Sequence, residues 1–362
     1  MQSTEFRLGL DHTPVSIPAS LLFPFLRGGS VATAPYNGAQ PFPGADISAP
    51  MDAQRAVRIS VTGLIVLGPF IGLGVAIWTQ WGHGLGAADL ALAAFFYLLT
   101  GFGVTAGFHR CLTHRSYTAR PALRAALAIA GSMSFQGQVI GWVAIHRRHH
   151  AFADRPGDPH SPYRYGTSPL GQLRGAAHAH LGWLFSTESI SAEHYAPDLL
   201  ADSAMRRVSR AFPLLCVLSL ALPALAGWAI GGSLGAAWSA LLWAGAVRVF
   251  LLQHVTWSVN SLCHLLGARP FTTRRYDRAT NLWPLALLSL GESWHNTHHC
   301  DPACARHGVE RGQIDPSAAL IRLLERLGWA WDVRWPVAAR FDERRRPAGG
   351  ARTPFGARIG AS

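Results

Sequence analysis

The chain has 362 residues, of which 49% are hydrophobic and only 14% are charged, against about 25% charged in an average soluble protein, so its composition favours a membrane protein. Its net charge of +12 comes from 32 arginines without any lysine, and no aromatic residues are interleaved among them as in nucleic-acid-binding motifs, so we expect no nucleic-acid partner. The five cysteines are an odd number without a framework spacing, which argues against a disulfide-bonded protein of an oxidising compartment.

The first segment, residues 1–50, mixes Pro, Gly and Ser with scattered apolar residues. It has no basic start followed by an apolar core, so we expect a poorly ordered cytoplasmic leader rather than a cleavable signal peptide. Four stretches of roughly 20 apolar residues follow, each long enough to cross a bilayer as a helix. They run over about 59–78, 87–108, 212–231 and 234–257.

These four spans pair as two hairpins, because short connections join the first span to the second and the third to the fourth. The connections, 79–89 and 232–234, contain no arginine, whereas 109–210 holds 12 arginines and 269–358 holds 15. Positive charge is retained on the cytoplasmic side, so both termini and both long segments should lie there. We therefore predict an all-α protein of the cell membrane with four transmembrane helices in two hairpins.

The domain organisation follows from these spans. We expect residues 51–341 to form one membrane domain, whose cytoplasmic helical cap is built from 109–210 and 258–341. Residues 342–362 contain three consecutive arginines and several glycines, and we expect them to form a flexible tail.

Two features near the spans need a separate interpretation. Arg248 lies inside the fourth span, where it could be a snorkelling or core-facing charge or could line the roof of an active site. The stretch Ala122–Ile145 is apolar enough to resemble a fifth span, but it carries Gln136 and Gln138. If it crossed the membrane, the first two histidine clusters described below would lie on opposite faces. We therefore expect a helix that is buried in the cap or lies at the interface.

Histidine is concentrated in three short clusters, which hold eight of the 17 histidines in 16 positions. The clusters are His109-Arg-Cys-Leu-Thr-His114, His146-Arg-Arg-His149-His150 and His295-Asn-Thr-His298-His299. Imidazole is the commonest side-chain ligand for transition metals, and eight are more than one four-coordinate zinc ion can use. Their number therefore indicates two metal ions, and iron with open positions for oxygen is the natural candidate.

The spacing within the clusters suits metal binding on helices. His149 and His150 lie at i+3 and i+4 from His146, on one face of a helix, and the third cluster repeats this pattern. Two such triads facing each other can bridge a pair of metals. His109 and His114 are about 140° apart around an α-helix, so we expect them to reach different ions or the helix to unwind between them. All three clusters lie at the same membrane boundary and can therefore meet.

The clusters, their order and their placement around two apolar hairpins resemble the integral-membrane fatty acid desaturases over about Thr100–Trp335. The likeness is closest to the acyl-CoA delta-9 (stearoyl-type) branch, of bacterial type, because the segment Asn260-Ser-Leu-Cys-His264 matches its NxxxH motif. The resemblance implies that His264 is a ninth iron ligand and that Asn260 approaches a metal through a water molecule.

The resemblance also implies the reaction and the remaining site residues. It implies removal of two vicinal hydrogens from a saturated acyl chain, with O2 reduced to water and a cis double bond formed, at delta-9 in this branch. The cofactor would be two non-haem iron ions. The implied iron ligands are His109, His114, His146, His149, His150, His264, His295, His298 and His299. The implied lining of the acyl tunnel is Gln136, Trp142, Thr256 and Trp257.

Two departures from the family pattern bear on the acyl carrier. Ala144-Ile145 stands where animal acyl-CoA desaturases have Arg-Asp, and Asp301-Pro302 stands where Phe-Pro is familiar. We favour acyl-CoA as the substrate, and acyl carrier protein and phospholipid remain alternatives. The sequence has no cytochrome b5 signature, no dinucleotide-binding glycine motif and no ferredoxin-type cysteine run. We therefore expect electrons from a separate reductase or ferredoxin, whose acidic surface would meet the arginine-rich face.

Several other interpretations stay open on the sequence. A related membrane fatty acyl or alkyl hydroxylase or monooxygenase would use the same metals, although the NxxxH segment argues against it. A membrane metal transporter would need histidines along a pathway within its spans, whereas these lie at the ends of spans. Cys300 and Cys304 could form a zinc site with His298 and His299, but a second ligand pair is missing. We expect His254 to be a packing residue or to support a ligand.

Overall fold

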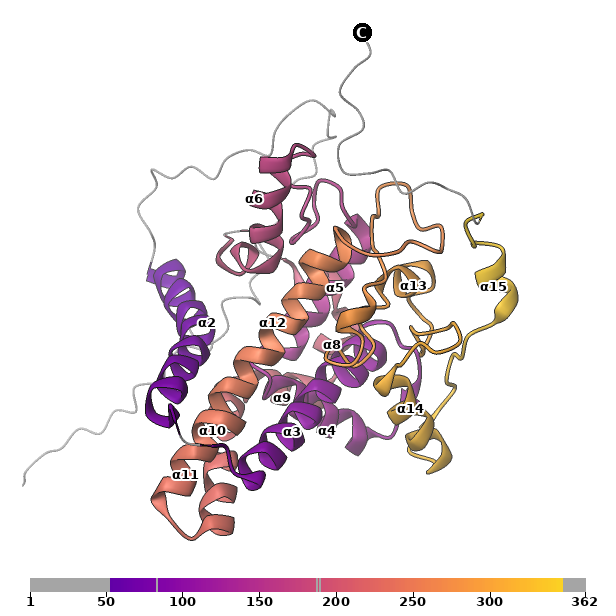
Figure 1. The fold of residues 1–362 in the computed structure, drawn as a ribbon. Helices are drawn as coiled ribbons and strands as arrows, with labels where there is room; N and C mark the ends of the chain where they lie inside the picture. Colours follow the sequence, from indigo (N-terminus) through magenta and orange to yellow (C-terminus); the bar gives the residue numbers. More distant parts are fainter. Residues whose placement is uncertain (1–52, 83, 187, 189, 348–362) are drawn as a thin grey trace, which may run out of the picture.

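The computed structural model describes residues 53–347 apart from 83, 187 and 189, and helices predominate in this part of the chain (Figure 1). Four helical stretches are long and apolar enough to cross a membrane, which confirms four candidate spans: Ala56–Gln80, Ala87–Thr113, Phe212–Gly231 and Leu234–His264. The second and fourth continue beyond the predicted ends, at 108 and 257, and carry histidines of the predicted site. The predicted leader, 1–50, lies outside the described residues.

Each span is built from one or more helical elements. The first is α2 (Ala53–Gln80), and the second is α3 (Ala87–Phe102) continued by the π-helix η1 (Gly103–Thr113). The third is α10 (Phe212–Gly231), which contains no charged residue. The fourth joins α11 (Leu234–Ala240), the π-helix η3 (Leu241–Val247), α12 (Arg248–Ser261) and the 3-10 helix η4 (Leu262–His264).

The remaining elements fall into two groups along the chain. Between the second and third spans lie β1 (Thr118–Ala119), α4 (Pro121–Ser132), α5 (Val139–Phe152), α6 (Pro169–His180), η2 (Gly182–Phe185), α7 (Ala192–Tyr195), α8 (Pro197–Ala201) and α9 (Ser203–Arg210). After the fourth span come η5 (Trp283–Leu285), α13 (His295–Cys300), α14 (Pro316–Arg326), β2 (Ala330–Trp331) and α15 (Ala338–Asp342). The strands β1 and β2 pair antiparallel and tie the two groups together.

The first span packs along the fourth. The rings of Phe70 and Phe250 lie 6.0 Å apart, and the Gln253 side chain donates a hydrogen bond to the Ile65 carbonyl oxygen at 3.1 Å. α10 and α11 also pack closely, because a Cβ added at Gly227 would lie 2.4 Å from the Ala240 Cβ. Small residues allow helix backbones to approach in this way inside a bilayer, where lipid gives apolar side chains no reason to associate.

Arg248 is a core residue of the fourth span. Its side chain is buried and donates hydrogen bonds to the carbonyl oxygens of Ala244 and Ser219, both at 2.9 Å, and of Met133 at 3.3 Å. These bonds join the fourth span to α10 and to the end of α4, and they settle the interpretation of Arg248 in favour of a core-facing charge. Its neighbours are backbone and hydroxyl oxygens, so its role is to connect helices.

The apolar stretch Ala122–Ile145 does not form a spanning helix. It is divided into α4 and the start of α5, and neither is among the candidate spans found in the described residues. The inner face of α4 packs against η1, where a Cβ added at Gly103 would lie only 2.1 Å from the Gly131 backbone nitrogen. The expected buried helix is therefore present, but as two helices separated by residues 133–138.

We expect Gly103→Ala to destabilise the protein by about 1–3 kcal/mol, because the new methyl group would force η1 away from the backbone of α4. Gly74→Ala on α2 is the matched control, since a Cβ there meets no atom within 4 Å and alanine favours helix by up to about 1 kcal/mol. Thermal unfolding midpoints of the two purified variants would test the difference. Equal midpoints would show that the contact between η1 and α4 can widen without cost.

The described fold continues past the predicted start of the tail at residue 342. The backbone N–H groups of Thr272 and Arg346 donate to the carbonyl oxygens of Arg344 and Pro270, at 2.7 and 2.8 Å. Residues 342–347 thus hold to the loop after the fourth span, while the rest of the predicted tail lies outside the described residues.

Candidate metal centre

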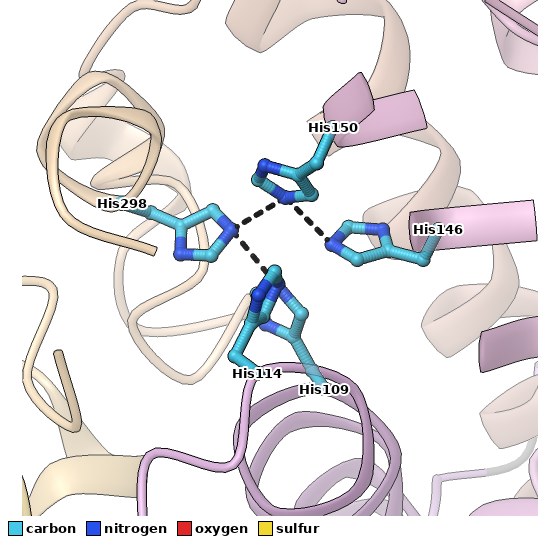
Figure 2. Close-up of side chains that lie close together, drawn as sticks. All are labelled: His109, His114, His146, His150 and His298. Atoms are coloured by element: carbon cyan, nitrogen blue, oxygen red, sulfur yellow. Dashed lines mark hydrogen bonds between the residues drawn. The ribbon is translucent and has the colours of Figure 1, made fainter. Parts of the chain in front are cut away.

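The three histidine clusters are carried by three helices that converge on one point: η1, α5 and α13. Figure 2 shows His109 from η1 and His114, the residue directly after η1, facing His146 and His150 from α5 and His298 from α13. The Nε2 atoms of His109 and His298 lie 3.1 Å apart, those of His298 and His150 2.9 Å, and those of His150 and His146 3.0 Å. Ring nitrogens from three distant segments thus meet at one place.

All nine predicted ligand histidines fall into two groups, in each of which one nitrogen per ring lies within 4.8 Å of the others. We call them the five-histidine group and the four-histidine group. The five-histidine group is His109, His114, His146, His150 and His298. The four-histidine group is His149, His264, His295 and His299.

The two groups divide each triad rather than keeping it together. On α5, His146 and His150 are one turn apart and join the five-histidine group, whereas His149 turns to the other group. On α13, His295 and His299 are one turn apart and join the four-histidine group. The two histidines of each i+4 pair therefore stay in one group, and the middle histidine of each triad, His149 or His298, belongs to the other group.

His109 and His114 lie in the same group, contrary to one of the two outcomes expected from α-helical geometry. The reason is the π-helical winding of η1, which places residue i+5 above residue i: the His114 N–H donates to the His109 carbonyl oxygen at 3.1 Å. The two ring centroids are consequently 4.8 Å apart. The π-helix is wound less tightly than an α-helix, so the helix is partly unwound at this point, which is the second expected outcome.

Four buried carboxylates contact the Nδ1 atoms of four of these histidines. His149 contacts Asp158 at 3.0 Å, His264 contacts Asp154 at 2.7 Å and His299 contacts Asp277 at 2.8 Å. His109 contacts Glu292 in the same way. A carboxylate accepts a hydrogen bond from Nδ1–H, which keeps the ring proton on Nδ1 and the lone pair on Nε2, as in metal-binding histidines.

The nitrogen atoms in the four-histidine group fit a cation. With Asp158 and Asp277 charged, the Nδ1–H groups of His149 and His299 donate hydrogen bonds to them. Both Nε2 atoms then present lone pairs, yet these atoms lie only 3.4 Å apart. The Nε2 of His295 is 3.0 Å from those of both His264 and His299, and a single ring proton can satisfy one of these contacts. Lone pairs that converge in a buried site need a positive ion between them.

The protonation states also suit a metal. Burial and neighbouring rings lower the pKa of five histidines well below the ordinary value, so these rings are neutral and able to bind a cation: His114, His146, His150, His295 and His298. Burial alone would raise the pKa of Asp158 and of Asp277, but the facing rings of His149 and His299 outweigh it and lower both pKa values. The carboxylates are therefore charged.

The four carboxylates were not predicted as site residues. Asp154 and Asp158 follow the second cluster closely, and Glu292 precedes the third by three residues, so the habit of metal-bound histidines of pairing with carboxylates could have suggested them. Asp277 offers no such signal, because it lies in a loop more than 20 residues from His299 in sequence. Its role depends on the fold alone.

A buried ion-pair network supports the first cluster. Arg110, which is fully buried, donates to Glu292 and Asp315, and the shortest nitrogen–oxygen distance to each carboxylate is 3.0 Å. His307 packs against His298 with ring centroids 4.4 Å apart, and its backbone N–H donates to Asp315 at 2.7 Å. This network joins η1 to the segment after α13.

The predicted tunnel residues lie in different surroundings. Trp142 stacks on His146, with ring centroids 5.0 Å apart and planes 15° from parallel. Gln136 is half-buried, and its amide nitrogen has no hydrogen-bond partner among the described residues. Thr256 donates to the carbonyl oxygen of its own helix at Leu252, at 3.0 Å. Trp142 is thus the tunnel candidate in direct contact with the five-histidine group.

Two further predicted site residues, Trp257 and Asn260, lie on α12. Trp257 faces α6, and Asn260 lies near the C-terminal end of α12. Trp257 is buried against the rings of His254 and His180, at centroid distances of 5.2 and 6.0 Å. The His254 Nδ1 is 3.0 Å from the His180 Nε2, so His254 packs between helices as expected. Asn260 is half-buried, one turn before His264.

The cysteines do not contribute to a metal site in the described part of the chain. Cys300 and Cys304 are buried with Phe271 and Phe341 in a small apolar cluster, and no group of candidate metal ligands among the described residues includes a cysteine. Burial raises the pKa of Cys304 to about 11, which keeps it a thiol rather than a metal-binding thiolate. The zinc site considered from the sequence is therefore not supported.

A cleft of about 720 Å³ reaches the two histidine groups from the outside. Three of its lining residues are histidines of the two groups, His114, His150 and His299, and most of the others are polar. The lining residues other than these histidines are Thr272, Thr273, Arg274, Asp277, Cys300, Asp301, Pro302, Glu343 and Arg344. The centre is therefore accessible to small polar molecules on this side.

Comparison with known proteins gives the family context of this site. Residues 79–313 match the model of the fatty acid desaturase family, and this range contains all nine histidines. The chain is 38% identical over 279 residues to the hex-5-enoyl-[acyl-carrier protein] acetylenase of Moorena producens, covering 76% of the chain and 86% of that protein. It is 38% identical over 245 residues to the acyl-CoA C20 Delta5-desaturase of Anemone leveillei, covering 66% and 72%. It is 34% identical over 251 residues to the sn-1 stearoyl-lipid 9-desaturase of Synechocystis sp., covering 68% and 72%.

Proposed function

The chain belongs to the fatty acid desaturase family, and from this premise we propose that it inserts a cis double bond at the delta-9 position of a saturated acyl chain, using a centre of two iron ions held by nine histidines. As a member of this family it is an oxidoreductase that acts on fatty acyl chains. The resemblance seen in the three histidine clusters is thereby confirmed at the level of the family.

The observation that carries the proposal is the convergence of nine buried or half-buried histidine rings in two adjacent groups. Iron bound there supplies the strong oxidant, formed with O2 and two electrons, that removal of hydrogen from an unactivated methylene requires. The four-histidine group has fewer ligands, and we propose that Asn260 completes it through a water molecule. Asn260 lies one turn before His264, on the same helical segment.

The surrounding protein keeps this chemistry in place. The exposed fraction of His149, His264 and His298 is 1% each, so these rings are closed to bulk water, while the cleft opens on His114, His150 and His299. The four carboxylates hold ring orientations, and Trp142 covers one side of the five-histidine group by stacking on His146. We propose that Trp142, Gln136, Thr256 and Trp257 line the tunnel that fixes the acyl chain.

The acyl carrier and the bond position are the finer parts of this proposal. The names of the three relatives specify different acyl carriers: acyl carrier protein, CoA and a stearoyl lipid. Two of the names also specify a bond position, Delta5 in one and 9 in the other. We propose acyl-CoA as the first carrier to test. The name of the Synechocystis protein supports the 9 position.

We also propose the setting in which the enzyme works. The arginine asymmetry supports two hairpins in the cell membrane, with both termini, the helical cap and the metal centre on the cytoplasmic side. O2 is the second substrate. Electrons would come from a separate reductase or ferredoxin.

Lipid analysis of a desaturase-deficient bacterial host that expresses the chain would test the proposed function. Gas chromatography with mass spectrometry of the fatty acids should show a new cis-monounsaturated acid with its double bond at carbon 9. A new hydroxy acid without a double bond would favour the hydroxylase alternative. An unchanged lipid profile together with increased metal uptake would favour the transporter.

We expect Trp257→Ala to change the chain length or the bond position of the product, because it removes a large buried ring from the proposed tunnel wall. Trp238→Ala on α11 is the control, since that ring is 46% exposed and lies on the same span away from the centre. The ratios of products from fatty acids of different length give the readout. The same product profile in both variants would remove Trp257 from the tunnel.

A further inference from the structure

The carboxylates beside the metal centre are distributed unequally between the two histidine groups. Three of the four rings in the four-histidine group contact a buried carboxylate through Nδ1. In the five-histidine group, the described ion pairs give this contact to His109 alone, through Glu292. The ratio of three to one makes the two groups chemically different.

Each of the three carboxylates of the four-histidine group is held by further hydrogen bonds. Asp158 accepts from the backbone N–H groups of Asp154 and His160, at 2.9 and 3.1 Å. Asp277 accepts from the Ala279 backbone N–H at 2.9 Å, and Asp154 accepts from that of Arg278 at 2.8 Å. These bonds fix the carboxylates before any metal arrives, so the rings they contact are oriented in advance.

The single carboxylate of the five-histidine group has a different electrostatic setting. One oxygen of Glu292 contacts His109, while the other accepts from the guanidinium of Arg110 at 3.0 Å. Its negative charge is therefore shared with a buried cation. A metal ion in the five-histidine group would gain less from Glu292 than an ion in the four-histidine group gains from three carboxylates.

We propose that Asp154, Asp158 and Asp277 are positioning residues that serve the four-histidine site alone, and that Glu292 serves the five-histidine site alone. Each carboxylate keeps the proton of its ring on Nδ1 and makes Nε2 the metal-binding atom. The two sites therefore lose metal independently when their own carboxylates are changed. This inference rests on the proposed function, because it assumes that both groups hold a metal.

The test counts the metal ions retained by the purified full chain after anaerobic loading with Fe(II), in competition with a chelator at the concentration where the unaltered protein keeps both ions. Asn and Gln replace the carboxylates because they keep the shape and remove the charge. Each single change should weaken binding at one site by about 10–100-fold. Inductively coupled plasma mass spectrometry of the eluted protein gives iron per chain.

Pairs of substitutions distinguish the sites. Asp158→Asn with Asp277→Asn removes two carboxylates from one site, so about one iron per chain should remain. Asp158→Asn with Glu292→Gln removes one carboxylate from each site, so almost no iron should remain under the same chelator. The control is Asp202→Asn, which caps α9 through two backbone N–H groups, and asparagine caps as well as aspartate does. It should keep both ions.

A merely structural role would not give this pattern, because general loosening of the fold would release both ions from either pair. Loss of both ions from the same-site pair, or retention of one by the cross-site pair, would overturn the assignment. Retention of both ions by the same-site pair would do so as well. If that pair does not elute as a single species, Asp154→Asn replaces Asp277→Asn in it. Failure of the unaltered chain to bind iron would instead refute the proposed function.

Discussion

Replacing His149 by alanine is expected to abolish desaturation and to lower the iron content of the protein. His149 is the ring of α5 that reaches the four-histidine group, and its Nδ1 is held by Asp158. Its loss removes one of four nitrogens from that site. The effect on activity should exceed the 10–100-fold that loss of an outer hydrogen-bond partner typically costs, about the largest expected of any single change.

The control is His194→Ala, because His194 is exposed on α7 and its one ring contact in the described residues is edge-on with its neighbour Tyr195. It should keep both product and iron. Fatty acid analysis of expressing cells and metal analysis of the purified variants provide the two readouts. Wild-type desaturation by the His149 variant would refute the assignment of the second cluster to the metal centre.

Replacing Arg110 by methionine is expected to have the largest effect on stability, about 3–5 kcal/mol. The side chain of Arg110 is fully buried and sits between Glu292 and Asp315, and it also donates to the Ala305 carbonyl oxygen at 2.8 Å. Methionine fills similar space but leaves two buried carboxylates without a cation. Uncompensated buried charge is what makes the loss of one partner so costly.

Arg124→Met is the matched comparison for this prediction. Arg124 pairs with Asp202 at 2.8 Å, but its side chain is 32% exposed, and such pairs contribute about 0–1 kcal/mol. Denaturant unfolding of the two variants in the same detergent gives the free energies. Similar losses in both would show that Arg110 contributes no more than a surface ion pair.

The spans and the ligand histidines were the features most open to prediction from sequence. Runs of about 20 apolar residues identify helices for a bilayer because the backbone must satisfy its own hydrogen bonds there. The i+3 and i+4 spacing of His146, His149 and His150 predicted candidate ligands on a helix because this spacing depends on one helix alone. Both signals are local. The four candidate spans are confirmed, and these histidines converge with the other clusters, while their role as metal ligands stays a prediction.

The division of histidines between two groups could not be read from that spacing. Which ring of a triad turns to which group depends on how α5 and α13 are rotated against each other, and that rotation is set by packing across the whole fold. The pairing of His109 with His114 needed a π-helix, which arises where α4 packs closely against η1. Of the two outcomes expected from the sequence, a departure from α-helical winding is the one that the structure has.

The sequence by itself determined that the chain is an apolar, mainly helical protein with three histidine clusters spaced as metal ligands are, because apolar length and helical periodicity act over a few turns. The tertiary structure alone decided the grouping of the nine rings and the partners of their Nδ1 atoms. His264 meets Asp154 across 110 residues of chain, and His109 meets Glu292 across more than 180. Such pairs are selected by burial, since a carboxylate inside the fold must find a cation or a donor, and the neighbour that supplies it is fixed only when the helices have packed.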